Sequence, residues 1–204
     1  GATLDRVRTL DRTTGELRAF AAADCGLGYR TSRFKAEAGR WVVLDVSLQL
    51  RLSATSEPVR YAELARTLGV EVGDRAPLGE VREAVLGLRR GKGMVLDADD
   101  HDTWSVGSFF TNPVLDPLAA AALPADAPRF PQPDGRVKTS AAWLIEHAGV
   151  ARGRSLGGAA VSTKHTLALT NRGRATAADV VALAREVRGQ VHAAYAVVLE
   201  PEPT

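Results

Sequence analysis

The sequence has almost no cysteine, few aromatic residues and no long apolar run, and each shortage excludes a class of protein. Its 204 residues include one cysteine, Cys25, which excludes an internal disulfide and any metal site built from several cysteines. The apolar runs fall far short of the roughly 20 residues that a membrane span needs, and no signal-peptide pattern opens the sequence. We therefore expect a cytoplasmic protein without a membrane partner.

Neither sign of charge dominates. Lys and Arg total 26 against 24 for Asp and Glu, and the charges are interspersed along the sequence. This pattern does not favour nucleic acid as a partner, and we predict no metal site. A hydrophobic content of 45% with 25% charged residues is typical of a globular protein that can bury one or two cores.

The first part of the sequence has strand patterns. Residues 6–11 and 16–20 flank a turn-like segment, Arg12-Thr13-Thr14-Gly15, and so predict a hairpin. Because an isolated hairpin is marginally stable in water, we expect it to belong to a larger sheet. Residues 44–52 alternate leucine or valine with polar side chains, which predicts a strand with one buried and one solvated face.

Helix patterns become frequent after residue 61. Val81, Ala84, Val85 and Leu88 have helical spacing and are followed by a basic end, which suits the helix dipole. Four prolines between residues 123 and 135 predict an irregular surface connection. We further predict a helix over 139–149, a strand over 166–170, a helix opened by a capping box at Thr176, and a last strand over 194–199. The mixture predicts an α+β fold.

Four segments occur in an order that resembles one enzyme family. They are Tyr29-Arg30-Thr31-Ser32-Arg33-Phe34-Lys35, Gly107-Ser108-Phe109-Phe110-Thr111-Asn112-Pro113, Lys138-Thr139-Ser140-Ala141-Ala142-Trp143-Leu144-Ile145-Glu146 and Leu199-Glu200-Pro201-Glu202, and the weaker run 162–171 also matches. Together they resemble the UDP-N-acetylenolpyruvoylglucosamine reductase (MurB) family. The matches span nearly the whole chain.

The resemblance implies a two-part flavin-binding module followed by a substrate-binding domain of antiparallel sheet and helices. The glycine-rich segment that cradles the FAD pyrophosphate would precede residue 1, and the 204 residues contain no such segment. Residues 1–100 then correspond to a remnant of the second FAD-binding subdomain with a substrate loop, and residues 101–204 to the substrate-binding domain. Apolar surface where the flavin part should dock would bind the missing segment or drive self-association.

The resemblance also implies a reaction. In the family, NADPH reduces FAD, and the flavin passes a hydride to the enolpyruvyl double bond of UDP-N-acetylglucosamine enolpyruvate, which gives UDP-N-acetylmuramate for peptidoglycan. Negative charge then develops on the neighbouring carbon and the carboxylate, and it must be held and quenched by a proton. By resemblance, Arg30 and Glu202 hold the carboxylate and Ser108 donates the proton. Burial should raise the pKa of Glu202.

Further positions match substrate contacts in the family. Arg89 and Lys92 correspond to groups that bind the pyrophosphate, and cations suit that role. Tyr61 corresponds to the tyrosine of a loop that folds over the uridine nucleotide. Arg89 and Lys92 could equally form a solvated basic helix end, and Tyr61 could be an ordinary amphipathic tyrosine. Asn112 and His165 lie where the family places polar substrate contacts, although His165 could also be a simple strand histidine. The predicted substrate-binding residues are Tyr29, Tyr61, Arg89, Lys92, Asn112 and His165.

Two other hypotheses stay open at the level of sequence. A truncated relative without FAD could act as a nucleotide-sugar binding module or a non-redox enzyme, which the missing glycine-rich segment favours. An α+β scaffold without any site is the other. The retained Arg30, Ser108 and Glu202 favour the reductase, because a pure binder has little reason to keep a proton donor beside a carboxyl group.

Overall fold

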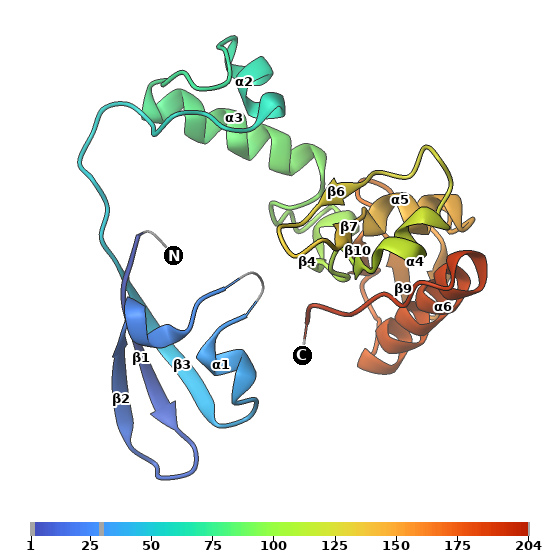
Figure 1. Ribbon diagram of the computed structural model, residues 1–204, viewed down its shortest axis with the longest axis horizontal. Coiled ribbons are helices and arrows are strands. Elements are labelled where there is room, and N and C mark those ends of the chain that lie inside the picture. The colour runs from blue at the N-terminus through green and yellow to red at the C-terminus, as the bar shows by residue number, and fades with distance from the viewer. Residues whose placement is uncertain (1–2, 29–30, 204) are drawn as a thin grey trace. The chain divides into compact units, whose positions relative to one another are not determined.

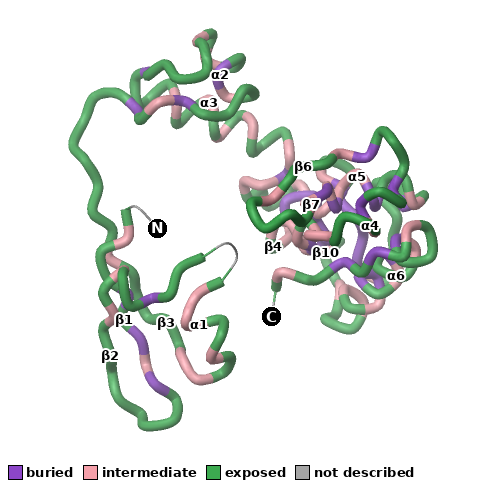
Figure 2. The backbone as a smooth tube through the Cα atoms, in the orientation of Figure 1, coloured by how far each residue is buried: buried purple, intermediate pink, exposed green. Residues whose placement is uncertain are grey.

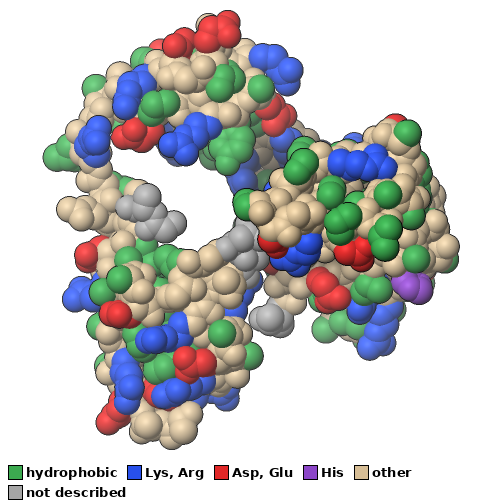
Figure 3. Space-filling view, viewed as in Figure 1, with side chains coloured by type: hydrophobic (Ala, Val, Ile, Leu, Met, Phe, Trp, Pro, Cys, Tyr) green, Lys and Arg blue, Asp and Glu red, His purple; other side chains and the backbone are tan. Residues whose placement is uncertain are grey.

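The structure is a computed structural model that describes residues 3–28 and 31–203. Its contacts divide the chain into two compact units, Gly1–Thr55 (unit 1) and Ser56–Thr204 (unit 2). Figure 1 shows the elements of both units. From the sequence we expected a different boundary, near residue 100, between a flavin-binding part and a substrate-binding part. That functional boundary stays a prediction. Figure 3 shows charged side chains of both signs interspersed over the surface of each unit.

Unit 1 is a three-stranded antiparallel sheet in the order β2-β1-β3. The strands are β1 (Leu4–Asp11), β2 (Leu17–Ala21) and β3 (Trp41–Leu48), and two short helices lie between β2 and β3, η1 (Ala22–Cys25) and α1 (Arg33–Ala36). The predicted hairpin is confirmed: Arg8 pairs with Ala19 of β2 and, on its other side, with Asp45 of β3. Gly15 closes the hairpin turn with a φ of 73°, which favours glycine.

The prediction for β3 is wrong in two respects. The strand ends at Leu48, and Leu50 and Leu52 lie beyond it, 70% and 100% exposed. Its apolar side chains are also not buried (Figure 2). Phe20 makes edge contacts with Phe34 and Trp41 at centroid distances of 5.7 and 5.1 Å, which is the main apolar cluster that we find in unit 1.

Unit 2 mixes short strands with helices, and the expected α+β class is confirmed. One antiparallel sheet has the order β4-β10-β9-β8 and a second the order β5-β7-β6. The helical elements are α2 (Ala62–Leu68), α3 (Leu78–Gly91), η2 (His101–Thr103), α4 (Pro117–Ala121), α5 (Ala141–His147) and α6 (Ala177–Tyr195). The strands are β4 (Ser105–Ser108), β5 (Val114–Leu115), β6 (Phe130–Pro131), β7 (Val137–Lys138), β8 (Ser155–Leu156), β9 (Ala159–Val161) and β10 (Ala168–Asn171).

The core of unit 2 forms where α5 and α6 meet the first sheet. Helix α6 contacts α5, β8, β9 and β10. Its Leu183 is completely buried with Leu144 and Ile145 of α5 and Val161 of β9. Both predicted helix starts are confirmed: Ser140 caps α5, and Thr176 forms a reciprocal capping box with Asp179 at α6. This core fixes the strands that carry the site described below.

Two other predictions for this region are wrong. The expected strand over 194–199 does not form, because α6 continues to Tyr195 and ends where Ala196 takes a φ of 54°. Val197 and Leu199 are nevertheless buried, so the apolar pattern reflects core contacts without strand pairing. The proline-rich connection contains the two-residue strand β6, placed at the edge of its sheet where proline is tolerated. Among the described residues, no helix has the length and apolar character to cross a membrane.

Candidate functional site

Three segments that are distant in sequence lie side by side around Phe109. The backbone N–H of Phe109 donates to the carbonyl oxygen of Leu167 at 2.7 Å. On the other side, the N–H of Glu202 donates to the carbonyl oxygen of Phe109 at 2.8 Å. Phe110 forms a bridge with Pro201, and its side chain is buried in the core. The core therefore anchors all three segments.

This pairing brings together two of the three predicted catalytic positions. Ser108 is the last residue of β4 and stands opposite Ala168 of β10, while Glu202 follows the bridge to Phe110. Both residues are half-buried. Gly107, with a φ of 87°, has no atom within 4 Å of the position that a Cβ would take, so the backbone before Ser108 borders open space. The strand end is accessible to a ligand.

Arg30 and Tyr29 lie outside the described residues. The structure therefore does not place the third predicted catalytic residue, and its part in the site stays a prediction.

His165 lies in the loop between β9 and β10, close to the strand pairing around Phe109. Its Nδ1 accepts the backbone N–H of Leu167 at 3.1 Å, and its own N–H donates to the Ser162 hydroxyl oxygen. An Nδ1 that accepts an amide hydrogen leaves the proton of a neutral ring on Nε2. Burial lowers the pKa of His165, and the nearby charges of Lys92 and Arg152 lower it further. Burial and these charges favour the neutral imidazole, whose one N–H, on Nε2, is then able to donate.

The end of α3 borders the same strand. A cleft of about 440 Å³ is lined by Arg89, Gly93, Met94, Ser105, Val106 and Gly107, among others. Arg89 therefore faces the residues that precede Ser108. Lys92 caps α3 and donates to Glu63 of α2 at 2.7 Å, and its charge lowers the pKa of His165. Tyr61 precedes α2 and is 76% exposed.

Asn112 has a structural contact in this arrangement. Its Oδ1 accepts the backbone N–H of Ala141 at 2.9 Å, at the first residue of α5. The side chain thereby ties the segment after Ser108 to the start of that helix. Contact with a substrate through the amide nitrogen stays a prediction.

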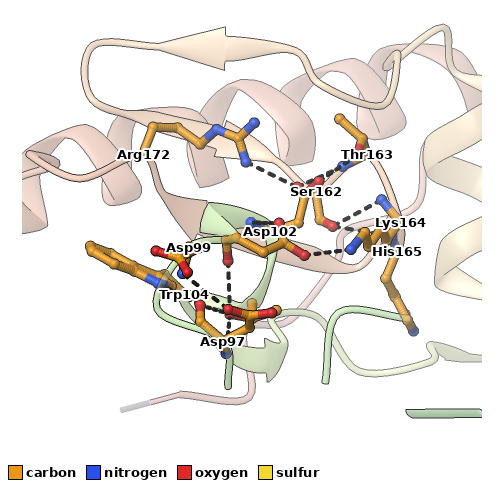
Figure 4. A network of polar contacts seen from close by, with 11 residues as sticks. Asp97, Asp99, Asp102, Trp104, Ser162, Thr163, Lys164, His165 and Arg172 are labelled. Carbon is orange, nitrogen blue, oxygen red and sulfur yellow. Dashed lines mark hydrogen bonds and ion pairs between the residues drawn. The ribbon is translucent and has the colours of Figure 1, made fainter. Parts of the chain in front are cut away.

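The most connected polar group of the region is Asp102, which we did not single out from the sequence (Figure 4). Its Oδ1 accepts the N–H of Thr163 and an N–H of Arg172, each at 3.0 Å, and its Oδ2 accepts the Thr163 hydroxyl. Burial alone would raise the pKa of Asp102, but the donors Thr163 and Arg172 hold it below its ordinary value. The sequence shows Asp102 only within an acidic, apparently solvated stretch.

The adjacent glycines of the described residues do not fit the pyrophosphate of FAD. The one pair of adjacent glycines, Gly157 and Gly158, is closed by the chain itself. A Cβ at Gly157 would meet the Asp179 carboxylate at 2.1 Å, and one at Gly158 would meet the backbone of Ala175 at 2.7 Å. No room for a phosphate remains at these glycines. The described part of the chain also holds no group of three or more His, Cys, Asp or Glu side chains able to bind a metal ion.

Comparison with known proteins decides the family. Residues 99–204 match the family model of the UDP-N-acetylenolpyruvoylglucosamine reductase C-terminal domain. The chain belongs to this family. Curated relatives include UDP-N-acetylenolpyruvoylglucosamine reductases of Cutibacterium acnes, 56% identical over 100% of this chain and 54% of the relative, and of Streptomyces coelicolor, 55% identical over 99% and 56%.

The chain spans about half the length of the curated relatives that it matches. The fold is also similar to a crystal structure of the MurB reductase from Thermus caldophilus. That match has a TM-score of 0.53 and 21% identity, and it covers 99% of this chain and 52% of the other.

Proposed function

We propose that this chain binds UDP-N-acetylglucosamine enolpyruvate and provides the proton-transfer side of its reduction to UDP-N-acetylmuramate, an oxidoreductase step of cytoplasmic peptidoglycan synthesis. The observation that carries the proposal is the backbone pairing that sets Ser108 and Glu202 on either side of Phe109, in a chain that belongs to the reductase family. FAD, reduced by NADPH, would supply the hydride. Because Gly157 and Gly158 leave no room for the FAD pyrophosphate, we assign the described residues no step in hydride transfer.

The chemistry of the enol ether sets what this chain must provide. Addition of hydride to the terminal carbon leaves negative charge on the adjacent carbon and on the carboxylate. A neutral hydroxyl can quench that carbanion by giving up its proton, and Ser108 at the open end of β4 supports this role. Glu202, with Arg30, would hold the substrate carboxylate. Because the backbones of Ser108 and Glu202 lie in neighbouring segments, the proposed proton donor and the proposed carboxylate-binding group would act on the same substrate.

The charge distribution supports a pyrophosphate site on the same side. Arg89 lines the cleft next to Ser105 and Gly107, and Lys92 stands at the end of the same helix. Guanidinium and ammonium groups are the usual partners of phosphate oxygens. The neutral N–H of His165 can donate to a sugar or phosphate oxygen without adding charge. Tyr61 would contact the uridine nucleotide.

Calorimetric titration of this chain with UDP-N-acetylglucosamine enolpyruvate tests the binding half of the proposal. We expect wild type to bind and Glu202→Ala to weaken binding about tenfold, because it removes the protonated carboxyl group that would donate a hydrogen bond to the substrate carboxylate. Ser155→Ala, an exposed serine of β8, is the matched control and should bind like wild type. Equal affinity of wild type and Glu202→Ala would contradict the assigned site.

The catalytic half needs the longer protein. The chain joined to the flavin-binding segment of the Cutibacterium acnes relative should oxidise NADPH in the presence of the enol ether. Ser108→Ala should leave substrate affinity nearly unchanged and lower turnover by about 10²–10⁴-fold, the range for loss of a general acid. Turnover at the wild-type rate by Ser108→Ala would refute its role. Tight binding without any NADPH oxidation by wild type would instead support a nucleotide-sugar binding module.

A further inference from the structure

The acidic turn, residues 97–104, is an ordered element built around its own hydrogen bonds. The single hydrogen of the Thr103 hydroxyl is shared between the carbonyl oxygens of Asp97 and Asp100, at 2.9 and 2.8 Å, and the hydroxyl oxygen accepts the N–H of Asp97. Asp100 caps the short helix η2 by accepting the N–H of Asp102 at 3.0 Å. These contacts fix the backbone from which the side chain of Asp102 extends. The turn leads directly into β4 and Ser108.

Asp102 joins this turn to the loop that carries His165. It accepts both the backbone N–H and the hydroxyl of Thr163, two residues before His165. Its side chain is 8% exposed, and that of its cationic partner Arg172 is 37% exposed. The neighbouring pair of Asp100 and Lys164 is more exposed, at 29% and 39%. A buried carboxylate with three donors holds the loop more firmly than a solvated ion pair can.

The same turn also contacts the end of α3. A Cβ on Gly93 would lie 2.8 Å from the carbonyl oxygen of Asp102 and 3.7 Å from the side chain of Lys164. Only glycine permits this close approach at position 93. The backbone of Asp102 is therefore packed against the residue that follows Lys92. One residue thus touches the segments that carry Ser108, His165 and Lys92.

We propose that Asp102 is a positioning residue for substrate recognition: by holding Thr163 it fixes the 162–165 loop and orients the His165 imidazole. Figure 4 shows the imidazole extending from that loop on the side away from Asp102, so Asp102 acts through the backbone and not by touching the ring. The ligand-binding consequence of this inference rests on the proposed function. The effect of Asp102 on the orientation of His165 in the free chain does not depend on the proposed function.

The charged groups around His165 determine how its pKa should shift if the 162–165 loop loosens. Lys92 and Arg152 lower its pKa and Glu146 raises it, while burial has the largest effect. Arg152 is itself bound to Glu146 at 2.7 Å and to the Thr166 hydroxyl. If the loop loosens, the ring gains water and its pKa rises toward the ordinary value of about 6.5. Loss of the Asp102 charge alone would lower the pKa, because a negative charge favours the imidazolium.

Nuclear magnetic resonance of the imidazole nitrogens in the free chain tests the inference. We expect wild-type His165 to be the Nε2–H tautomer. Asp102→Asn should mix the two tautomers and raise the pKa of His165. Thr163→Val, which keeps the Asp102 charge and changes an exposed residue, should act in the same direction, and Thr163→Ser should behave like wild type. Asp134→Asn, in an exposed pair with Arg136, is the control.

The possible outcomes distinguish an effect of Asp102 on the position of the His165 ring from an effect of its charge on the pKa of His165. Unchanged nitrogen shifts and pKa in both Asp102→Asn and Thr163→Val would overturn the inference. A lower pKa of His165 in Asp102→Asn, with an unaltered tautomer, would also overturn it, because the carboxylate would then act only through space. Should Asp102→Asn not fold in thermal melting, Thr163→Val decides the matter.

A double-mutant cycle extends the test to the ligand. Asp102→Asn should weaken the affinity for UDP-N-acetylglucosamine enolpyruvate about tenfold, and by less than about twofold when His165 is already alanine. Equal losses in both backgrounds would mean that Asp102 does not act through His165. If wild type itself binds no ligand, the proposed function fails, and the imidazole measurement still decides whether Asp102 positions His165.

Discussion

Unit 1 and unit 2 differ in how much of their own apolar surface they bury. The largest completely buried apolar side chains, including Leu144, Ile145, Leu183 and Leu199, belong to unit 2. In unit 1, the buried apolar residues that we find among those described are Val7 and Cys25, and the side chains of β3 are exposed. Unit 2 thus has a core able to hold a site in place, whereas unit 1 leaves the apolar side chains of β3 exposed.

The exposed apolar side chains of β3 are candidates for the surface at which we predicted a partner. Val42, Val43, Leu44, Val46 and Leu48 are each between 42% and 55% exposed along one strand. Adjacent exposed apolar residues of this kind mark an interaction surface. A flavin-binding segment or a second copy of the chain remains the predicted partner.

The sharpest contrast between the units should appear when one leucine is truncated in each. Leu183→Ala in α6 should lower the free energy of unfolding of unit 2 by about 2–5 kcal/mol, because it leaves a cavity in a closed core. Leu48→Ala in β3, at a site 55% exposed, should cost less than about 0.5 kcal/mol. Urea unfolding followed by circular dichroism measures both. A loss of unfolding free energy in Leu48→Ala as large as that in Leu183→Ala would contradict the difference in burial between the two units.

A smaller effect should appear on acidification, because each unit contains a buried aspartate paired with an arginine. Hydrogen bonds from Arg40 lower the pKa of Asp11 in unit 1, and the donors from Thr163 and Arg172 lower that of Asp102 in unit 2. A lowered pKa contributes stability that is present above the unfolded value of about 3.9 and lost as the pH falls through the folded value. We therefore expect both units to weaken below about pH 4 in thermal melting.

Single substitutions separate the two contributions. Asp11→Asn should flatten the acid dependence of unit 1 only, and Asp102→Asn that of unit 2 only, as followed by amide hydrogen exchange in each unit. An unaltered acid dependence in both variants would show that other carboxylates dominate.

Local sequence patterns correctly predicted those helices and strands whose determining residues lie within a few positions of one another. The hairpin around Gly15, the helix of Val81 to Leu88 and the capping box at Thr176 all have such signals, and the structure contains each element. Burial could not be predicted for β3, because alternation shows which side chains share a face and not whether another layer covers it. The apolar run after residue 194 suited a helix end as well as a strand, and the helix prevailed.

The site could be predicted in part, for a similar reason. The resemblance pointed to Ser108 and Glu202, and the structure sets them on neighbouring segments through Phe109 and Pro201. Asp102 was missed because its partners, Thr163 and Arg172, are 61 and 70 residues away in sequence. Within an acidic stretch, nothing local distinguishes a buried aspartate from its solvated neighbours.

The most direct test of the account is a map of amide chemical-shift changes as UDP-N-acetylglucosamine enolpyruvate is added to this chain. We predict that the largest changes fall on residues 105–110, 162–168 and 200–202, the segments that meet around Phe109. Changes confined to other parts of unit 2, with these three segments unaffected at saturating ligand, would contradict the account.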